Sequence, residues 1–283
     1  MDIFLQQIVN GLVQGSIYAL VALGYTMVYG IMGLINFAHG EVVMIGTLVT
    51  ITVAGTLLKA GMPVALAGLA GLTAAVLVCM ALGWALERIA YRPLRNAPRL
   101  TPLITAIGMS IVLQNLAMMI WGRNYLTFPS LLPKVNFELA GAHFTAIQII
   151  IVLVSAATMG GLLLLVYRTK LGMAMRATAQ NPAVASLMGV NINRVIAAAF
   201  VIGSALGALA GVMVGTYYEI AHYQMGFMLG LKAFTAAVLG GIGNLAGAML
   251  GGVLLGLIEA LGAGYIGDLT GGFLGSHYQD IFA

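Results

Sequence analysis

The chain has 283 residues, of which 61% are hydrophobic and only 7% are Asp, Glu, Lys or Arg. An ordinary soluble domain carries about 25% charged residues, and it needs them to cover its surface. So few charges exclude a soluble globular enzyme, and the high hydrophobicity excludes a disordered chain. We therefore expect an integral membrane protein whose outer surface contacts lipid, and we attribute the net charge of +4 to topology signals rather than to nucleic-acid binding.

The apolar residues form long unbroken runs, which excludes an outer-membrane barrel built from strands of about ten alternating residues. The 38 glycines favour helices that pack closely within a bilayer. The predicted fold is all-α, a polytopic membrane helix bundle with about seven to eight crossings. The single cysteine, Cys79, lies in an apolar run, where we expect it to be buried. One thiol leaves no disulfide and no cysteine-based metal site within the chain, and we predict no metal site.

Apolar runs of about 20 residues predict the membrane spans. They lie at 8–30, 42–58, 62–86, 103–121, 144–167 and 195–217, and a Gly-rich stretch follows at 227–263. The connections 87–102 and 168–194 are rich in Arg and Lys, so the positive-inside rule assigns both to the cytoplasm. Connection 122–143 and the N-terminus are then external, and segment 264–283, which has no Lys or Arg, is also expected to be external.

The first span is followed by GLINFAHGEVVMIG at residues 33–46, where Asn36, His39 and Glu41 interrupt apolar sequence. Ionisable groups within membrane segments are costly and usually face a cavity or a partner. One interpretation is a broken helix that lines a transport pathway, with Gly40 allowing the break. The other is a cytoplasm-facing turn with a solvated histidine and glutamate. Weaker pathway candidates lie in later runs: Gln114, Asn115 and Glu259.

The Gly-rich stretch is too long for a single crossing, and its middle reads GGIGNLAG at 240–247. Glycine clusters break helices, and irregular backbone at membrane depth is tolerated where protein surrounds it. The sequence predicts either a broken or re-entrant helix pair or a short loop between two ordinary spans. Small residues recur through this stretch and predict close approach of a neighbouring helix, at Gly240, Gly243, Gly247, Gly251, Gly252 and Gly256.

The basic connection 168–194 predicts two short helices, near 171–179 and at about 182–188. Asn181 before Pro182 is typical of a helix start, and Gly189 of a helix stop. Exposed Met and Leu side chains on the cytoplasmic side indicate a docking partner. An interfacial helix resting on lipid headgroups is the alternative.

Motifs of common enzymes are absent from the sequence. It has no G-x-x-x-x-G-K-[ST] phosphate loop and no H-E-x-x-H motif, and its four histidines are scattered. We therefore predict that the chain is not an enzyme and has no ATPase site of its own.

Three segments carry a resemblance to a known family: GSIYALVALGYTMVYGIMGLINFAHGEVVMIG (15–46), LITAIGMSIVLQN (103–115) and KAFTAAVLGGIGNLAGAMLGG (232–252). They resemble the LivH-type permease of bacterial branched-chain amino-acid ABC importers. Close relatives in that group import urea or short amides, so this substrate class stays open. A stand-alone secondary transporter or channel, with His39 and Glu41 binding protons, is the alternative from another class.

The resemblance implies that residues 1–283 form a single permease domain in the bacterial inner membrane, and that one further span follows residue 283. It implies a second homologous permease, two cytoplasmic ATPase subunits that bind ATP and Mg, and a periplasmic protein that delivers Leu, Ile or Val. Surrounding lipid is a further expected contact, while nucleic acid and a cofactor within this chain are not expected. The segment AVASLMG (183–189) is similar to the family's coupling motif, although Gln180 and Asn181 replace its usual acidic residue. The candidates for coupling to the ATPase are Met175, Arg176, Asn181, Ala185, Leu187, Met188 and Gly189.

Overall fold

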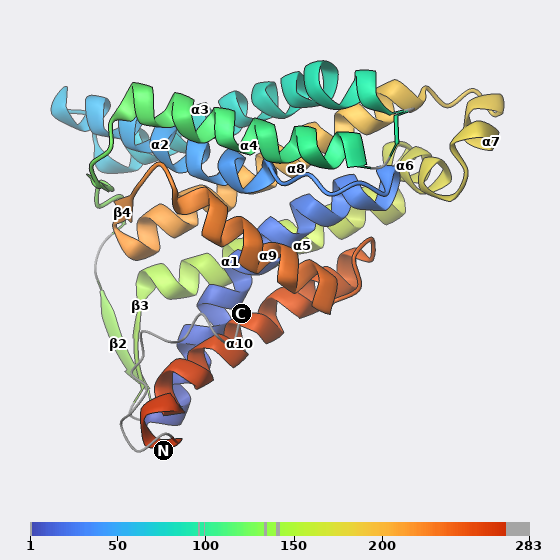
Figure 1. The fold of residues 1–283 in the computed structure, drawn as a ribbon. Helices are drawn as coiled ribbons and strands as arrows, with labels where there is room; N and C mark the ends of the chain where they lie inside the picture. Colours follow the sequence, from blue (N-terminus) through green and yellow to red (C-terminus); the bar gives the residue numbers. More distant parts are fainter. Residues whose placement is uncertain (1, 96, 99, 133–134, 140–141, 270–283) are drawn as a thin grey trace.

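The computed structural model describes residues 2–269 except 96, 99, 133–134 and 140–141 (Figure 1). This part is predominantly helical, and seven of its helices are long and apolar enough to cross a membrane. The helices are α1 (Asp2–Met32), α2 (His39–Lys59), α3 (Val64–Ala85), α4 (Leu100–Trp121), α5 (Ala146–Arg168), α6 (Lys170–Gln180), α7 (Pro182–Leu187), α8 (Ile192–Tyr218), α9 (Met225–Leu239) and α10 (Leu245–Leu269), with a π-helical turn at Leu86–Tyr91 and a 3-10 turn at Arg92–Leu94. The predicted polytopic helix bundle is confirmed. The expected external segment 264–283 lies outside the described residues from 270 onward.

The two ends of the bundle differ in character. Short helices α6 and α7 lie at one end and short strands at the other (Figure 1). The strands form two antiparallel pairs, β1 (Leu126–Thr127) with β4 (Ile220–Ala221) and β2 (Asn136–Leu139) with β3 (Ala142–Thr145).

Side-chain contacts at each end agree with the topology predicted from charge. Arg95 Nη1 donates to Asn193 Oδ1 at 2.5 Å, so the two basic connections meet at the α6–α7 end. At the strand end, the backbone N–H of His143 donates to Gln6 Oε1 near the start of α1. The positive-inside rule predicts that the α6–α7 end is cytoplasmic, and the start of α1 then lies at the external end.

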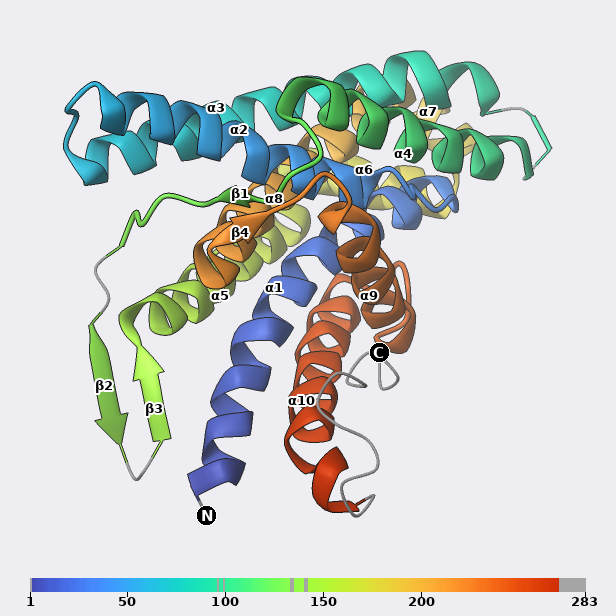
Figure 2. The same cartoon turned by 60° about the vertical axis from the view of Figure 1, so that its left-hand side comes forward.

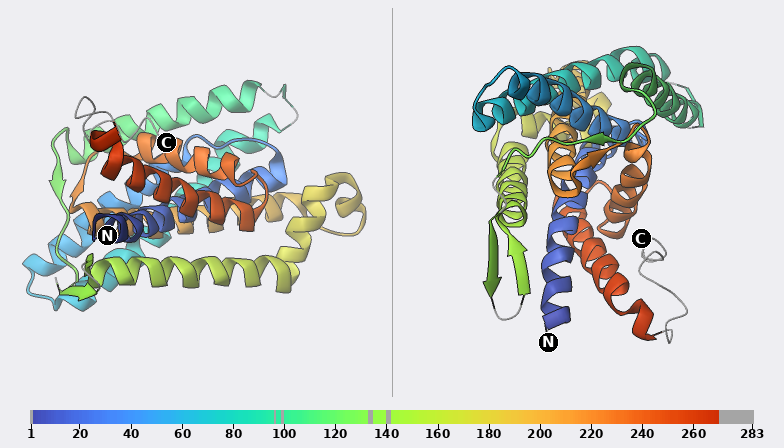
Figure 3. Two further views of the ribbon diagram at one scale, coloured as in Figure 1. Left: turned by 90° about the horizontal axis from the view of Figure 1, so that it is seen from below. Right: turned by 90° about the vertical axis from the view of Figure 1, so that its left-hand side faces the viewer.

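Helix α1 forms the centre of the bundle. Its residues 19–23 are completely buried, and α5, α8, α9 and α10 all pack against it (Figures 2 and 3). Helices α3, α4 and α5 instead expose large apolar side chains along their lengths, including Leu77, Ile104 and Leu153. Exposed apolar surface of this extent fits lipid rather than water.

Helices α1 and α10 lie side by side (Figure 2), and glycines form their contact. A Cβ added at Gly256 would lie 2.2 Å from the backbone nitrogen of Gly15, and one at Gly15 would lie 2.7 Å from the Cα of Val253. Backbone therefore contacts backbone, which is the way small residues promote helix association in membranes. The close approach predicted for the Gly-rich stretch is confirmed here.

The same stretch contains the predicted break. Helix α9 has 15 residues and rises about 22 Å, which is less than the roughly 30 Å of a bilayer core. The chain then reverses at residues 240–244, where Gly241 and Gly243 have φ of 86° and 97°. A Cβ added at Gly240 would lie 1.9 Å from the carbonyl oxygen of Gly247, so the two arms are in direct contact. The interruption is a tight helical hairpin with a short first arm, rather than a loop between two ordinary spans.

The α1–α10 contact gives the first prediction. Gly256→Val places a branched side chain against the backbone of Gly15, and we expect the free energy of unfolding to fall by about 2 kcal/mol or more. The measurement is the thermal unfolding midpoint of the detergent-purified protein. Gly161→Val is the matched control, because no atom lies near an added Cβ there. Equal midpoints for the two variants would contradict backbone contact at Gly256.

Candidate functional site: a helix break, a buried glutamate and a pocket

The connection between α1 and α2 returns into the membrane. Helix α1 ends at Met32, and α2 begins at His39, whose ring lies directly against Gly24 of α1 and near Gly207 of α8. Gly24 lies eight residues before the end of α1, or about 12 Å along its axis. The connection therefore runs back alongside the bundle before α2 starts at membrane depth (Figure 1).

Burial decides between the two interpretations of this segment. His39 is 2% exposed and Glu41 is completely buried. The solvated cytoplasmic turn is therefore excluded, and the predicted helix break is confirmed. The expectation that Gly40 allows the break is wrong, because the break lies at residues 33–38 and Gly40 is inside α2, packed against Gly226. Asn36 anchors the extended connection, because its Oδ1 accepts a 2.7 Å hydrogen bond from the buried Tyr91 hydroxyl group.

The His39 ring packs between α1 and α8. Its ring lies edge-on to Tyr25 with the ring centroids 5.0 Å apart, and its Nε2 has no hydrogen-bond partner among the described residues. The surrounding glycines of α1 and α8 leave room for the imidazole. The structure thus places His39 in helix packing, away from the pocket described below.

Glu41 connects the start of α2 to α4. Its Oε1 accepts hydrogen bonds from Ser110 Oγ at 3.0 Å and from Gln114 Nε2 at 2.7 Å. Its Oε2 has no partner among the described residues and lies beside Gly226, where an added Cβ would be 2.7 Å away. The structure therefore joins two predicted residues, Glu41 and Gln114. Sequence reasoning missed Ser110, although its i, i+4 spacing to Gln114 indicates a shared helix face.

Two helix N-termini meet at this carboxyl group. Glu41 is in the first turn of α2, and Gly226 is in the first turn of α9. The glycines bring the helices into contact, since a Cβ added at Gly40 would lie 2.3 Å from the carbonyl oxygen of Gly226. The positive ends of helix dipoles favour negative charge, so both helix starts offset part of the cost of burying this carboxyl group.

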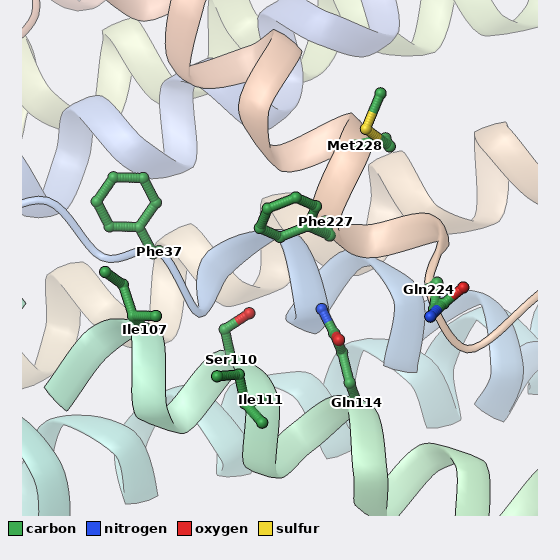
Figure 4. A pocket seen from close by; sticks show the side chains of 8 residues that line it. All are labelled: Phe37, Ile107, Ser110, Ile111, Gln114, Gln224, Phe227 and Met228. Carbon is green, nitrogen blue, oxygen red and sulfur yellow. The ribbon is translucent and has the colours of Figure 1, made fainter. Parts of the chain in front are cut away.

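A pocket of about 400 Å³ lies between α4 and α9 (Figure 4). Two of its lining residues, Ser110 and Gln114, are the donors to Glu41. Ser110 and Gln114 project into it from α4, and Phe227 faces them from α9. The full lining is Phe37, Ile107, Ser110, Ile111, Gln114, Gln224, Phe227 and Met228. Asn115 does not line it, because that side chain is exposed and donates to the carbonyl oxygen of Ile111 on its own helix.

Glu259 lies in a second buried polar cluster, between α1, α9 and α10. It accepts from the Tyr18 hydroxyl group at 2.9 Å and from Lys232 Nζ at 2.5 Å, and it is 1% exposed. Buried charges in proteins are normally paired in this way. Glu259 therefore links α10 to α1 and α9 through a hydrogen bond and an ion pair. Lys232 went unnoticed in the sequence, although it is the only basic residue in the stretch 227–263.

The second prediction concerns this ion pair. Lys232→Met leaves the buried Glu259 carboxylate without its cation, and we expect the free energy of unfolding to fall by about 3–5 kcal/mol. Adding Glu259→Gln removes the charge while keeping an acceptor for Tyr18, so the double variant should recover most of the loss. Thermal unfolding in detergent measures both. A double variant as unstable as the single one would show that charge pairing is not the stabilising feature.

The cytoplasmic connection forms the two predicted short helices, α6 and α7, which project from the bundle (Figure 3). Asn181 Oδ1 accepts from the backbone N–H groups of Ala183 and Val184, both at 3.1 Å, which confirms the predicted helix start. Gly189 ends the segment with φ of 84°. The intervening Leu187 and Met188 are 87% and 81% exposed, so the predicted apolar cytoplasmic surface is present.

The coupling candidates divide into two groups by exposure. Met175 and Ala185 are each 3% exposed, and they hold the short helices against the body of the protein. Those two side chains cannot themselves contact a partner. The exposed candidates are Arg176, whose guanidinium group lies 5.4 Å from the centre of the Tyr167 ring, together with Asn181, Leu187, Met188 and Gly189.

Comparison with known proteins agrees with this architecture. The family described as "Branched-chain amino acid transport system / permease component" matches residues 7–282. The chain belongs to this family. Its membership and the seven long apolar helices within the described residues make it a multi-pass inner-membrane protein.

Curated relatives match nearly the whole chain. The high-affinity branched-chain amino acid transport system permease protein BraD of Pseudomonas aeruginosa is 48% identical, over 99% of this chain and 90% of BraD. The corresponding protein LivH of Escherichia coli is 46% identical, over 98% of this chain and 89% of LivH. A solved structure, PsaBC from Streptococcus pneumoniae in complex with Fab, shares 14% identity at a TM-score of 0.45, over 98% of this chain and 87% of that chain.

Proposed function

We propose that this chain is the membrane permease of an ATP-driven importer that carries the branched-chain amino acids Leu, Ile and Val into the cell. The observation that supports this most strongly is the 46–48% identity, over nearly the full length, to permeases named for that transport. The same relatives favour branched-chain amino acids over urea or short amides. The chain itself contributes the passage and no ATPase site.

The proposed partners are a second homologous permease, two cytoplasmic ATPase subunits that bind ATP and Mg, and a periplasmic amino-acid-binding protein. The ATPase docks on α7, where Leu187 and Met188 present apolar side chains to the cytoplasm. Apolar side chains this exposed, at the end of the bundle rather than along its lipid-facing sides, fit a protein partner better than water.

Buried contacts connect the proposed docking surface on α7 and its neighbour α6 to the helices around Glu41. Met175 of α6 belongs to the same buried cluster as Met27 of α1. The end of α1 also contacts the Gly-rich turn, because Gly30 lies against Gly243. A displacement of α6 therefore acts on α1 and on the α9–α10 hairpin together. Both elements border the start of α2, where Glu41 is located.

The third prediction tests the transport activity. Proteoliposomes that contain this chain, the second permease and both ATPase subunits should accumulate radiolabelled leucine when the binding protein is outside and ATP is inside. Omitting ATP should abolish the accumulation. Leucine uptake by this chain alone under a proton or sodium gradient would instead support a stand-alone transporter, and uptake of urea in place of leucine would support the amide-importing relatives.

The fourth prediction tests docking on α7. The double change Leu187→Asp and Met188→Asp should remove ATPase subunits from the purified complex and abolish uptake, because charge replaces the apolar contact. Both side chains are exposed, so the permease itself should keep its unfolding midpoint.

Met62→Asp serves as the control for docking, since this exposed residue follows α2 at the external end. It should leave ATPase co-purification unchanged. Retention of the ATPase by the α7 double variant, at the level of the control, would refute the proposed docking surface.

A further inference from the structure

The pocket between α4 and α9 has a polar wall formed by Ser110 and Gln114, and this wall presents hydrogen-bond acceptors. Glu41 Oε1 accepts from both Ser110 and Gln114, and it does so whether the second oxygen carries a proton or not. The single hydroxyl proton of Ser110 is therefore donated to Glu41 and is not available to a ligand in the pocket. The amide nitrogen of Gln114 is likewise turned toward Glu41, so its carbonyl oxygen is directed away from the carboxyl group.

This fixed orientation determines which chemical group the wall can bind. Ser110 retains oxygen lone pairs, and Gln114 retains the carbonyl oxygen, because both donors are already directed to Glu41 Oε1. Acceptors whose own donors are already used favour a group with N–H donors, such as an ammonium group, and disfavour a carboxylate. Within the described lining there is no Lys or Arg to reverse this preference.

The rest of the pocket is apolar. Phe37, Ile107, Ile111, Phe227 and Met228 surround the polar wall, and the side-chain amide of Gln224 lies at the start of α9. The volume of about 400 Å³ falls within the roughly 300–1,000 Å³ that is usual for small-molecule sites. A primary ammonium group joined to a short aliphatic side chain matches this distribution of polar and apolar surface.

We propose that this pocket is an amino-acid subsite of the transport pathway, in which Ser110 and Gln114 accept hydrogen bonds from the ammonium group of the cargo. Glu41 acts as a positioning residue that fixes the Gln114 amide. The aliphatic side chain of the cargo lies against Ile107, Ile111 and Phe227, and the Gln224 amide is available as a donor to the carboxylate. The identity of the cargo rests on the proposed function, whereas the preference for an ammonium group rests on the geometry of Glu41, Ser110 and Gln114.

Adjacent amides on α4 provide a matched test in the reconstituted complete transporter. Gln114→Met keeps the side-chain length but removes the acceptor, and leucine uptake should fall roughly tenfold, because the ammonium group is left unpaired. Asn115→Leu should leave uptake unchanged, since Asn115 bonds to its own helix outside the pocket. Gln114→Met also removes a donor to the buried Glu41, so its unfolding midpoint should fall somewhat. ATPase co-purification of both variants should match the wild type, which separates lost binding from misfolding.

A labelling experiment locates the cargo directly. A cysteine introduced by Ile111→Cys should react with a water-soluble maleimide in the reconstituted transporter, and leucine should slow that reaction when the binding protein and ATP are present. Val135→Cys, at an exposed position of the external connection, should react at the same rate with and without leucine. The native Cys79 is completely buried and adds little background.

The possible failures are distinguishable. If the wild-type transporter imports leucine but Gln114→Met imports it equally well, or leucine does not protect Ile111→Cys, the subsite is refuted while the importer function stands. If the wild-type transporter imports no amino acid, the proposed function fails, and the assignment of this cargo fails with it.

Discussion

The main constraint on this protein is that polar groups inside the membrane must find partners within the protein. The chain places an extended connection, a histidine and a glutamate at membrane depth, where water cannot satisfy them. Asn36 is held by Tyr91, and Glu41 is held by Ser110 and Gln114 at the meeting of two helix starts. This arrangement requires α2, α4 and α9 to lie where they do.

Glycine makes that arrangement sterically possible. At Gly40 and Gly226, helices α2 and α9 come into backbone contact, and at Gly24 the absence of a side chain admits the His39 ring. At Gly15 and Gly256, helices α1 and α10 contact each other in the same manner. The high glycine content therefore serves close packing around the buried polar groups as well as the turns between helices.

Much of the fold was predictable because it depends on local or one-dimensional signals. Apolar run lengths predicted the spans, arginines predicted the cytoplasmic end, and Asn181 with Gly189 predicted the short helices. Partners distant in sequence were not predictable: Ser110 lies 69 residues from Glu41, and Lys232 lies 27 residues from Glu259. A composition pattern also cannot tell an inward amide from an outward one, which is why Gln114 and Asn115 looked equivalent before the helix was placed.

The β1–β4 pair has a consequence for how the pocket can widen. Strand β1 follows α4 and strand β4 precedes α9, so this short ladder ties the two walls of the pocket together at the periplasmic rim. The stacked rings of Tyr125 and His222, with centroids 4.6 Å apart, strengthen the same junction. The two helices that form the pocket walls, α4 and α9, are thus joined to each other at one end. We therefore expect any widening of the pocket to occur away from this junction, toward the end of the bundle where the ATPase subunits are proposed to bind.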